Sequence, residues 1–267
     1  MKKSNILGII GLLLIIFSQI NVFLKIQPFE KFHFIIIWAG YILFADYIIF
    51  LTKGKSWINN NPFAIIGMFI ISIPFWKMFE YINIRVNNWA YQGVEYFGAY
   101  SDLFAIVAFS TVIPAFMITL SFFTKDFSSS IPKERMSKPA FTLTIFLGIL
   151  SFILMMWLPR YLFALEWVFV FLIIDTINYR NKKESILYLF KSKKWRLVNH
   201  IIFASLIMGI LWEFWNYWAT VKWIYIIPFF DFLYIFEMPF LGYLGYIPFG
   251  FSIYSYYHFV RFLFKKD

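Results

Sequence analysis

Hydrophobic residues occur in long, nearly uninterrupted runs along this chain, and short polar segments separate the runs. Eight runs approach the ~20 residues that a helix needs to cross a hydrocarbon core of ~30 Å. They cover residues 6–24, 34–51, 63–84, 103–123, 141–158, 161–177, 201–219 and 240–260. Only Pro159 and Arg160 separate the fifth run from the sixth, as expected for a tight helical hairpin. The pattern predicts an all-α integral membrane protein with about eight transmembrane helices.

Positive charges lie unevenly on the two sides of these predicted helices. With the N-terminus inside, the outer segments contain Lys25, Lys31, Arg85, Arg160 and Lys222. Lys77 lies within a predicted span, and the rest of the 24 Lys and Arg residues fall on the inner side. Because Lys and Arg are enriched in cytoplasmic loops, we expect a multi-pass protein of the cell membrane with both termini in the cytoplasm.

Composition narrows the classes of function. Hydrophobic residues make up 61% of the chain and charged residues 14%, whereas soluble domains average about 45–50% and about 25%. The net charge of +10 is spread over short segments between apolar runs, so we expect contact with membrane lipid and no nucleic acid. The chain has no Cys, three His without zinc-site spacing, and no nucleotide-binding or serine-hydrolase motif. We therefore expect no cofactor and no metal.

Polar residues recur in the same order in the two halves of the sequence. Asp46 and Ser56 align without a gap on Asp175 and Ser185, each pair at the end of an even-numbered span. A second element, Glu-x-x-Asn followed by Trp-x-Tyr, occurs at the outer ends of the third and seventh spans. Its two copies are Glu80, Asn83, Trp89 and Tyr91, and Glu213, Asn216, Trp223 and Tyr225.

Shared hydrophobicity alone does not place these polar residues in register, so the pattern predicts an internal duplication. The predicted parts are a four-helix repeat at 1–126, a cytoplasmic linker at 127–140 and a second four-helix repeat at 141–267. Repeats with four spans face the same way, so we expect them to be parallel and related by an axis along the membrane normal.

The acidic residues within spans are candidate functional groups, because ionisable side chains are costly there. Glu80 with Asn83, and Glu213 with Asn216, are three residues apart and share a helix face. Apolar surroundings favour the neutral form of a carboxyl group, which can act as a general acid on a lipid-soluble substrate.

Two other interpretations stay open. The Glu–Asn pairs can join the two halves by hydrogen bonds between helices. Alternatively, carboxylate and amide oxygens can bind a divalent cation, in which case the outer loops would add Glu95, Asp102, Asp231 and Glu237.

Three charged residues have simpler expected roles. Asp46 and Asp175 lie near cytoplasmic ends, where we expect helix capping or pairing with Lys53 or Lys182. Lys77 precedes Glu80 by about one helical turn, and this spacing predicts an ion pair.

Aromatic residues are dense around the second Glu-x-x-Asn pair. Trp and Tyr belts at membrane interfaces and packing Phe explain most of the 24% aromatic content. The segment 212–218 exceeds what a belt needs, and Trp212, Trp215 and Trp218 lie near one another by helical spacing. Aromatic faces beside an acid suit a reaction that forms a carbocation, because ring quadrupoles stabilise cations. An aromatic pocket for a sterol or polyene would have the same pattern.

The second half also carries a series of motifs with a counterpart in a known family. Trp212-Glu213-x-Trp215, Trp223-x-Tyr225-x-x-Pro228 and Met238-Pro239, followed by a last span with Pro248, are similar to the heterodimeric-type lycopene cyclase domain. The resemblance covers residues 205–260, and residues 73–123 through the repeat. Phe240 follows Pro239 where the family has paired Glu residues, and Glu237 lies before the proline instead.

This resemblance implies a small all-helical protein that cyclises the ends of linear carotenoids by protonation, an isomerase- or lyase-type activity. Glu213, Glu80 and Glu237 are then the candidate catalytic acids. The candidate substrate-binding residues are Asn216, Asn83, Trp212, Trp215, Trp223, Tyr225, Trp89 and Tyr91.

Three hypotheses follow from the sequence. The first is an intramembrane enzyme that protonates, cyclises or otherwise modifies a carotenoid or other polyisoprenoid lipid through a buried Glu in an aromatic pocket. The second is a transporter or lipid-binding protein without enzymatic activity, whose Glu-x-x-Asn pairs line the interface between the halves. The third is a structural subunit in which these pairs serve packing.

Overall fold

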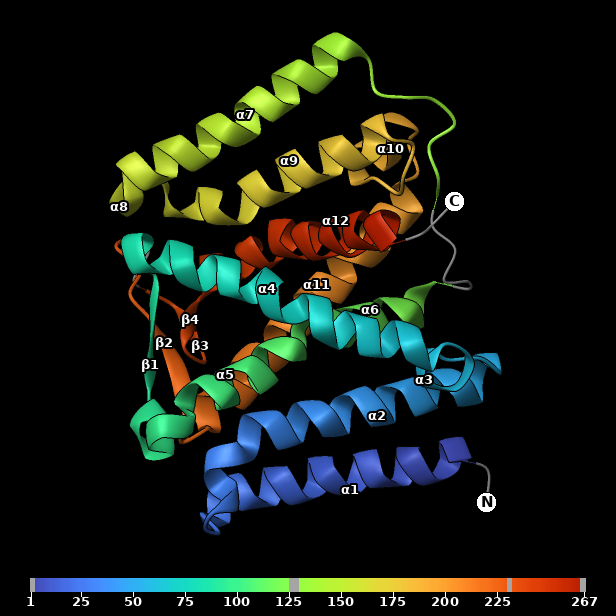
Figure 1. The fold of residues 1–267 in the computed structure, drawn as a ribbon. Coiled ribbons are helices and arrows are strands. Elements are labelled where there is room, and N and C mark those ends of the chain that lie inside the picture. Colours follow the sequence, from blue (N-terminus) through green and yellow to red (C-terminus); the bar gives the residue numbers. More distant parts are fainter. Residues whose placement is uncertain (1–2, 125–129, 230–231, 265–267) are drawn as a thin grey trace.

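The protein is mostly helical, as the computed structural model of residues 3–124, 130–229 and 232–264 shows (Figure 1). Within these residues, seven stretches are long and apolar enough to cross a membrane. They are Ser4–Leu24, Phe29–Lys53, Pro62–Val86, Val94–Phe123, Lys138–Trp157, Pro159–Arg180 and Trp195–Trp218. They coincide with the first seven predicted runs, so the prediction of several long apolar helices is confirmed.

The eighth predicted span corresponds to η4 (Phe240–Gly245) and α12 (Tyr246–Phe264). Helix α12 has 19 residues, but it is not one of the seven apolar stretches. Its sequence includes four tyrosines, two serines, His258 and Arg261. Its passage through the membrane stays a prediction.

The elements of the N-terminal half (residues 3–124) alternate long helices with short ones. They are α1 (Lys3–Leu24), η1 (Phe29–Phe32), α2 (His33–Lys53), α3 (Trp57–Asn60), α4 (Pro62–Val86), β1 (Trp89–Gln92), η2 (Val94–Tyr100), α5 (Ser101–Ser110) and α6 (Val112–Phe123).

The elements of the C-terminal half (residues 130–264) end with η4 and α12. Those before them are α7 (Lys138–Trp157), α8 (Pro159–Leu162), η3 (Phe163–Leu165), α9 (Glu166–Arg180), α10 (Ile186–Lys191), α11 (Trp195–Trp218), β2 (Lys222–Tyr225), β3 (Tyr234–Ile235) and β4 (Met238–Pro239).

The long helices lie side by side with the two sequence ends at one end of the molecule (Figure 1). Helices α1 and α2 pack together at one edge, and α7 packs on α9 at the opposite edge. Between them α4, α6, α11 and α12 pack against one another. The short helices α3 and α10 lie at the end that holds both termini, whereas β1 and β2 lie at the opposite end.

Local sequence explains where several helices begin and end. Helix α2 stops at Gly54, which has a φ of 71°, a left-handed conformation that glycine adopts without steric cost. Asn61 accepts a hydrogen bond from the backbone N–H of Ala64 and precedes Pro62, the first residue of α4. The predicted fourth span is interrupted between α5 and α6, because Pro114 has no N–H to donate to the preceding turn.

Asp175 fixes the start of α10 with four hydrogen bonds. It accepts from the hydroxyls of Ser185 (2.6 Å) and Ser255 (2.8 Å), and from the backbone N–H groups of Ile186 (2.9 Å) and Leu187 (2.8 Å). The carboxylate therefore joins α9, α10 and α12, and the predicted capping role is confirmed.

Asp46 has the same position before α3, where it accepts from the backbone N–H of Ile58 at 3.2 Å. Lys53 does not pair with it in the described structure. Its ammonium group donates instead to the carbonyl oxygens of Ser121, of Phe122 (3.0 Å) and of Thr124 (2.7 Å) at the end of α6. A cation at a helix C-terminus is stabilised by the unpaired carbonyl groups there.

Candidate functional site

Strands β1 and β2 bring together the two Trp-x-Tyr segments that follow the third and seventh predicted spans. The strands are antiparallel, with Trp89 opposite Tyr225 and Tyr91 opposite Trp223. Alternate residues of a strand point to the same face. All four aromatic side chains therefore lie on one face of a ribbon that joins the two halves of the chain.

Two asparagines hold this ribbon to the long helices. The side-chain amide of Asn216 in α11 donates to the carbonyl of Trp223 at 2.8 Å and its oxygen accepts from the N–H of Trp223 at 2.9 Å. Asn83 in α4 donates to the carbonyl of Trp89 at 2.8 Å and accepts from the N–H groups of Asn88 (2.8 Å) and Trp89 (3.3 Å). The backbone thus uses the hydrogen-bonding groups of both amides.

Glu80 lies one helical turn before Asn83 and contacts aromatic donors. Its Oε1 accepts from the hydroxyl of Tyr91 at 2.5 Å, the indole N–H of Trp76 at 2.6 Å and that of Trp89 at 3.3 Å. The predicted ion pair with Lys77 does not form in the described structure, because these three donors from α4 and β1 surround the carboxylate instead.

Glu213 occupies the corresponding place in the C-terminal half but has different partners. Its Oε1 accepts from the hydroxyls of Tyr225 at 2.6 Å and Tyr246 at 2.5 Å. Its Oε2 is buried and has no hydrogen-bond partner among the described residues. Tyr246 reaches the carboxylate from α12 because Gly209 leaves room for its ring: a Cβ on Gly209 would lie 2.3 Å from Cδ2 of Tyr246.

The strand tyrosines stay neutral at physiological pH. Burial and the neighbouring carboxylate of Glu80 raise the pKa of Tyr91 well above its usual value near 10.0. Burial and the carboxylate of Glu213 raise the pKa of Tyr225 in the same way. Both phenols therefore remain hydrogen-bond donors to the carboxylates.

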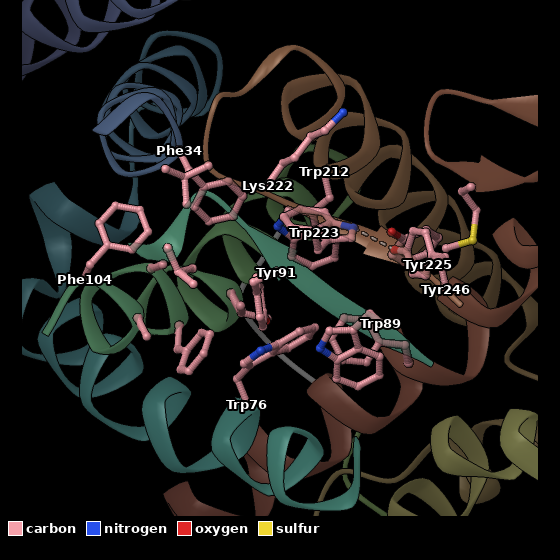
Figure 2. Close-up of a pocket in the computed structure, with 18 of the residues that line it drawn as sticks. Phe34, Trp76, Trp89, Tyr91, Phe104, Trp212, Lys222, Trp223, Tyr225 and Tyr246 are labelled. Carbon is pink, nitrogen blue, oxygen red and sulfur yellow. Dashed lines mark hydrogen bonds between the residues drawn. The ribbon is translucent and has the colours of Figure 1, made fainter. Parts of the chain in front are cut away.

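A cavity of about 160 Å³ lies over this face of the ribbon, between the two halves (Figure 2). Aromatic rings form most of its wall, and we call it the aromatic cavity. Its aromatic lining residues are Phe34, Trp76, Trp89, Tyr91, Phe104, Phe109, Trp167, Trp212, Trp223, Tyr225, Tyr246 and Phe249. The volume is close to the ~150 Å³ of an engineered protein cavity that binds benzene, so it fits a group the size of one ring.

The structure gives the predicted site residues three different positions. Five of them, Trp89, Tyr91, Trp212, Trp223 and Tyr225, line the aromatic cavity. Glu80 and Glu213 lie behind its wall and are hydrogen-bonded to its tyrosines. Asn83, Asn216 and Trp215 do not line it: the amides bind backbone, and the Trp215 ring packs on Trp38 at a centroid distance of 4.8 Å.

Glu237, the third candidate acid, forms an ion pair with Lys222, which lines the cavity. The stem of Lys222 lies beside Trp223 while its ammonium group points away from the rings (Figure 2). The catalytic and substrate-binding roles assigned to all these residues stay predictions.

Glu166 is an acidic residue near the cavity that sequence analysis missed. It is fully buried at the start of α9, and its Oε2 accepts from the side-chain amide of Asn88 at 2.9 Å. Its Oε1 and the amide oxygen of Asn88 have no partner among the described residues. The next residue, Trp167, lines the cavity. In the sequence, this residue could have been noticed as a single Glu next to a Trp near the start of the sixth predicted span.

The outer acidic residues that the structure describes do not assemble a metal site. The described part of the chain has no group of three His, Cys, Asp or Glu side chains that could hold a metal ion. Asp231, one of the predicted contributors, lies outside the described residues. Glu95, Asp102 and Glu237 therefore belong to no such group in the described chain, and the divalent-cation alternative gains no support from them.

Seven helices of this length and apolarity define a multi-pass helical membrane protein. Its distinguishing feature is an aromatic cavity between two halves, with hydrogen-bonded Glu–Tyr pairs in the wall. Comparisons with protein-family models, with curated proteins and with solved structures find no match to this chain. The particular activity therefore has to be argued from the site itself.

Proposed function

We propose that this chain is an intramembrane enzyme that isomerises the end of an isoprenoid lipid by adding and removing a proton. The observation that carries the proposal is the position of the three tyrosine hydroxyls. Tyr91, Tyr225 and Tyr246 line the aromatic cavity and each is hydrogen-bonded to a glutamate behind the wall. The cavity otherwise offers apolar and aromatic surface, which suits a hydrocarbon substrate.

The proposed step balances without an oxidant or a second substrate. In its neutral form Glu213 passes its proton to the phenol oxygen of Tyr225 or Tyr246, while the phenol proton goes to a carbon of the substrate double bond. The π electrons form the new C–H bond and leave a carbocation, which the surrounding rings stabilise. A neighbouring carbon then loses a proton to Tyr91, whose own proton passes to Glu80, and a neutral isomer results. Glu80 releases a proton and Glu213 takes one up before the next turnover, which restores both carboxyl groups.

The size of the cavity supports an end group rather than a whole lipid. A ring-sized volume of about 160 Å³ accommodates one cyclising end of a long chain. This matches what the resemblance to the lycopene cyclase domain implies, and we propose a linear carotenoid or related prenyl lipid as the substrate class.

We further propose that the two halves arose by duplication and that α12 is the eighth span. Three features support this. Equivalent Asp residues bind the starts of α3 and α10, equivalent Asn residues hold β1 and β2, and equivalent Glu residues bind the strand tyrosines. With α12 as a span, both termini lie on one side of the membrane, and the Lys and Arg distribution assigns that side to the cytoplasm.

The test is expression of the full chain in a bacterium that makes lycopene, followed by chromatography and mass spectrometry of the lipids. We expect a new product with the mass of its precursor. Glu213→Gln should lower its yield about a hundredfold, because a general acid contributes roughly 10²–10⁴ in rate. Glu134→Gln is the matched control, since Glu134 is an exposed partner of Lys191 far from the cavity. Lipid profiles identical to those of the empty vector, for lycopene and for related prenyl lipids, would refute the proposal.

A second candidate is lipid binding without chemistry. It is favoured by the position of the glutamates, since neither Glu80 nor Glu213 itself lines the aromatic cavity. In that case an unmodified isoprenoid should copurify with the protein, and equally with Glu213→Gln. The same lipid extracts decide between the two candidates.

A further inference from the structure

Three glutamates surround the aromatic cavity without a basic partner among the described residues. The hydrogen-bond donors to Glu80 and Glu213 are phenol and indole groups, and the donor to Glu166 is an amide. The ion pairs of the described chain involve other acids, such as Glu237 with Lys222. Glu166 and Glu213 are buried, and Glu80 is half-buried. Buried carboxylates without a counterion are costly, so Glu166 and Glu213 need either bound protons or a cation.

The wall of the cavity is suited to a cation. Tryptophan and tyrosine faces attract cations through the ring quadrupole, most strongly when water is excluded. The hydroxyls of Tyr91 and Tyr225 donate hydrogen bonds to carboxylates, which makes their rings more electron-rich. Negative charge behind an aromatic wall is the arrangement that recognises methylated ammonium groups.

The one basic side chain in the described lining does not occupy this space. Lys222 is neutralised by Glu237, and its ammonium group also lies 5.5 Å from the ring centroid of Tyr217, which is not a lining residue. Its head points away from the cavity rings (Figure 2). The centre of the cavity is therefore available to a ligand.

We propose that the aromatic cavity is a site for an organic cation of the methylated-ammonium type. The inference deepens the proposed function and rests on it for the identity of the site, because a carbocation formed there would be stabilised by the same rings and carboxylates. A trimethylammonium group is smaller than the ring-sized space of about 160 Å³.

The test compares choline with 3,3-dimethylbutan-1-ol, its neutral isostere, on the full chain purified in detergent. Titration calorimetry at constant ionic strength measures both affinities. We expect choline to bind at least tenfold more tightly than the alcohol. Equal affinities, or tighter binding of the alcohol, would overturn the inference, since size and shape are matched and only the charge differs.

Substitutions in the wall of the aromatic cavity test whether choline binds there. Glu213→Gln should lower choline affinity at least tenfold and leave the affinity for the alcohol unchanged, whereas the surface control Glu134→Gln should change neither. Trp223→Leu should also weaken choline binding, because it removes a ring from the wall. A choline preference that survives both cavity variants would place the cation elsewhere and refute the site. The wild-type comparison stands even where a variant does not fold.

This outcome is separable from that of the lipid assay. A protein that converts an isoprenoid but shows no preference for choline has the proposed function without the cation site. A protein that prefers choline and converts no isoprenoid has a cation-binding site without the proposed reaction. Each result refutes one statement and leaves the other intact.

Discussion

Replacing Gly209 by alanine tests the packing that brings Tyr246 to Glu213. The new Cβ would lie 2.3 Å from Cδ2 and 2.5 Å from Cγ of the Tyr246 ring, where ordinary contacts are 3.4–4 Å. The ring must therefore move by about 1 Å. Its hydroxyl now donates to Oε1 of Glu213 at 2.5 Å, so a shift of this size stretches the hydrogen bond to the limit of useful geometry.

The expected loss of stability follows from three contributions. Overpacking a buried contact costs about 1–3 kcal/mol, and a hydrogen bond to a charged group is worth about 1.5–3 kcal/mol. Alanine gains about 1 kcal/mol over glycine within a helix. Together these contributions predict a net decrease of about 1.5–5 kcal/mol in the free energy of unfolding, measured by chemical or thermal unfolding in detergent.

Two controls isolate the clash from the change of residue type. Gly67 lies in α4, and no atom lies within 4 Å of the position that a Cβ would take there, so Gly67→Ala should be neutral or stabilising by about 1 kcal/mol. In a Tyr246→Ala background, Gly209→Ala should no longer destabilise, because the ring it strikes is gone. Equal stability of Gly209→Ala and Gly67→Ala would refute the proposed packing.

Three further predictions concern the polar contacts of the fold. Asn216→Ala should lower the unfolding free energy by about 2 kcal/mol, since two hydrogen bonds to β2 are lost at about 1 kcal/mol each; exposed Asn59→Ala is the control, and equal unfolding midpoints would contradict this role. Asp175→Asn should cost about 3–5 kcal/mol in the same assay, because the amide places donors against donors in a buried network; full stability would show that the cap is dispensable. Tyr225 should stay neutral in an ultraviolet titration past pH 10, because burial and the carboxylate of Glu213 raise its pKa. The unfolded chain ionises this phenol near pH 10, so the free energy of unfolding should fall above about pH 10, by at most ~1.4 kcal/mol per pH unit. Ionisation near pH 10 in the folded protein would contradict its burial beside Glu213.

The long helices could be predicted from sequence because a membrane span imposes a simple length requirement. About 20 apolar residues are needed in a row, and the first seven runs satisfy it. The interruption at Thr111 between α5 and α6 was harder to predict from the sequence. Proline is tolerated inside some spans, as Pro74 is in α4, so Pro114 alone did not specify a break.

The strands were not predictable although their residues were identified. Each Trp-x-Tyr segment lies in a strand of four residues, and the strand that pairs with it is more than 100 positions away in the sequence. Nothing local favours pairing over an outer loop. The repeat in sequence marked Trp89 and Trp223 as equivalent, but the antiparallel contact between the copies is a property of the assembled fold.

The partners of the glutamates depended on tertiary structure in the same way. Helical spacing placed Lys77 near Glu80, yet β1 supplies Tyr91 and Trp89 to the carboxylate. Glu166 was not among the candidates from sequence, although it lies within the sixth predicted run. Its burial depends on Asn88, which lies 78 positions earlier in the chain.

The two Glu–Tyr pairs differ in their hydrogen-bond donors, and this difference would give the proposed proton transfer a direction. Glu80 receives two indole donors and one phenol, all on one oxygen. Glu213 receives two phenols and keeps one buried oxygen without a partner among the described residues, a place where a proton removes an unpaired charge. An isomerisation needs one group that gives a proton and another that accepts one. Two equivalent positions with unequal donors could provide both. In the proposed reaction Glu213 on α11 would be the acid and Glu80 on α4 the base, each bonded to a tyrosine of the ribbon.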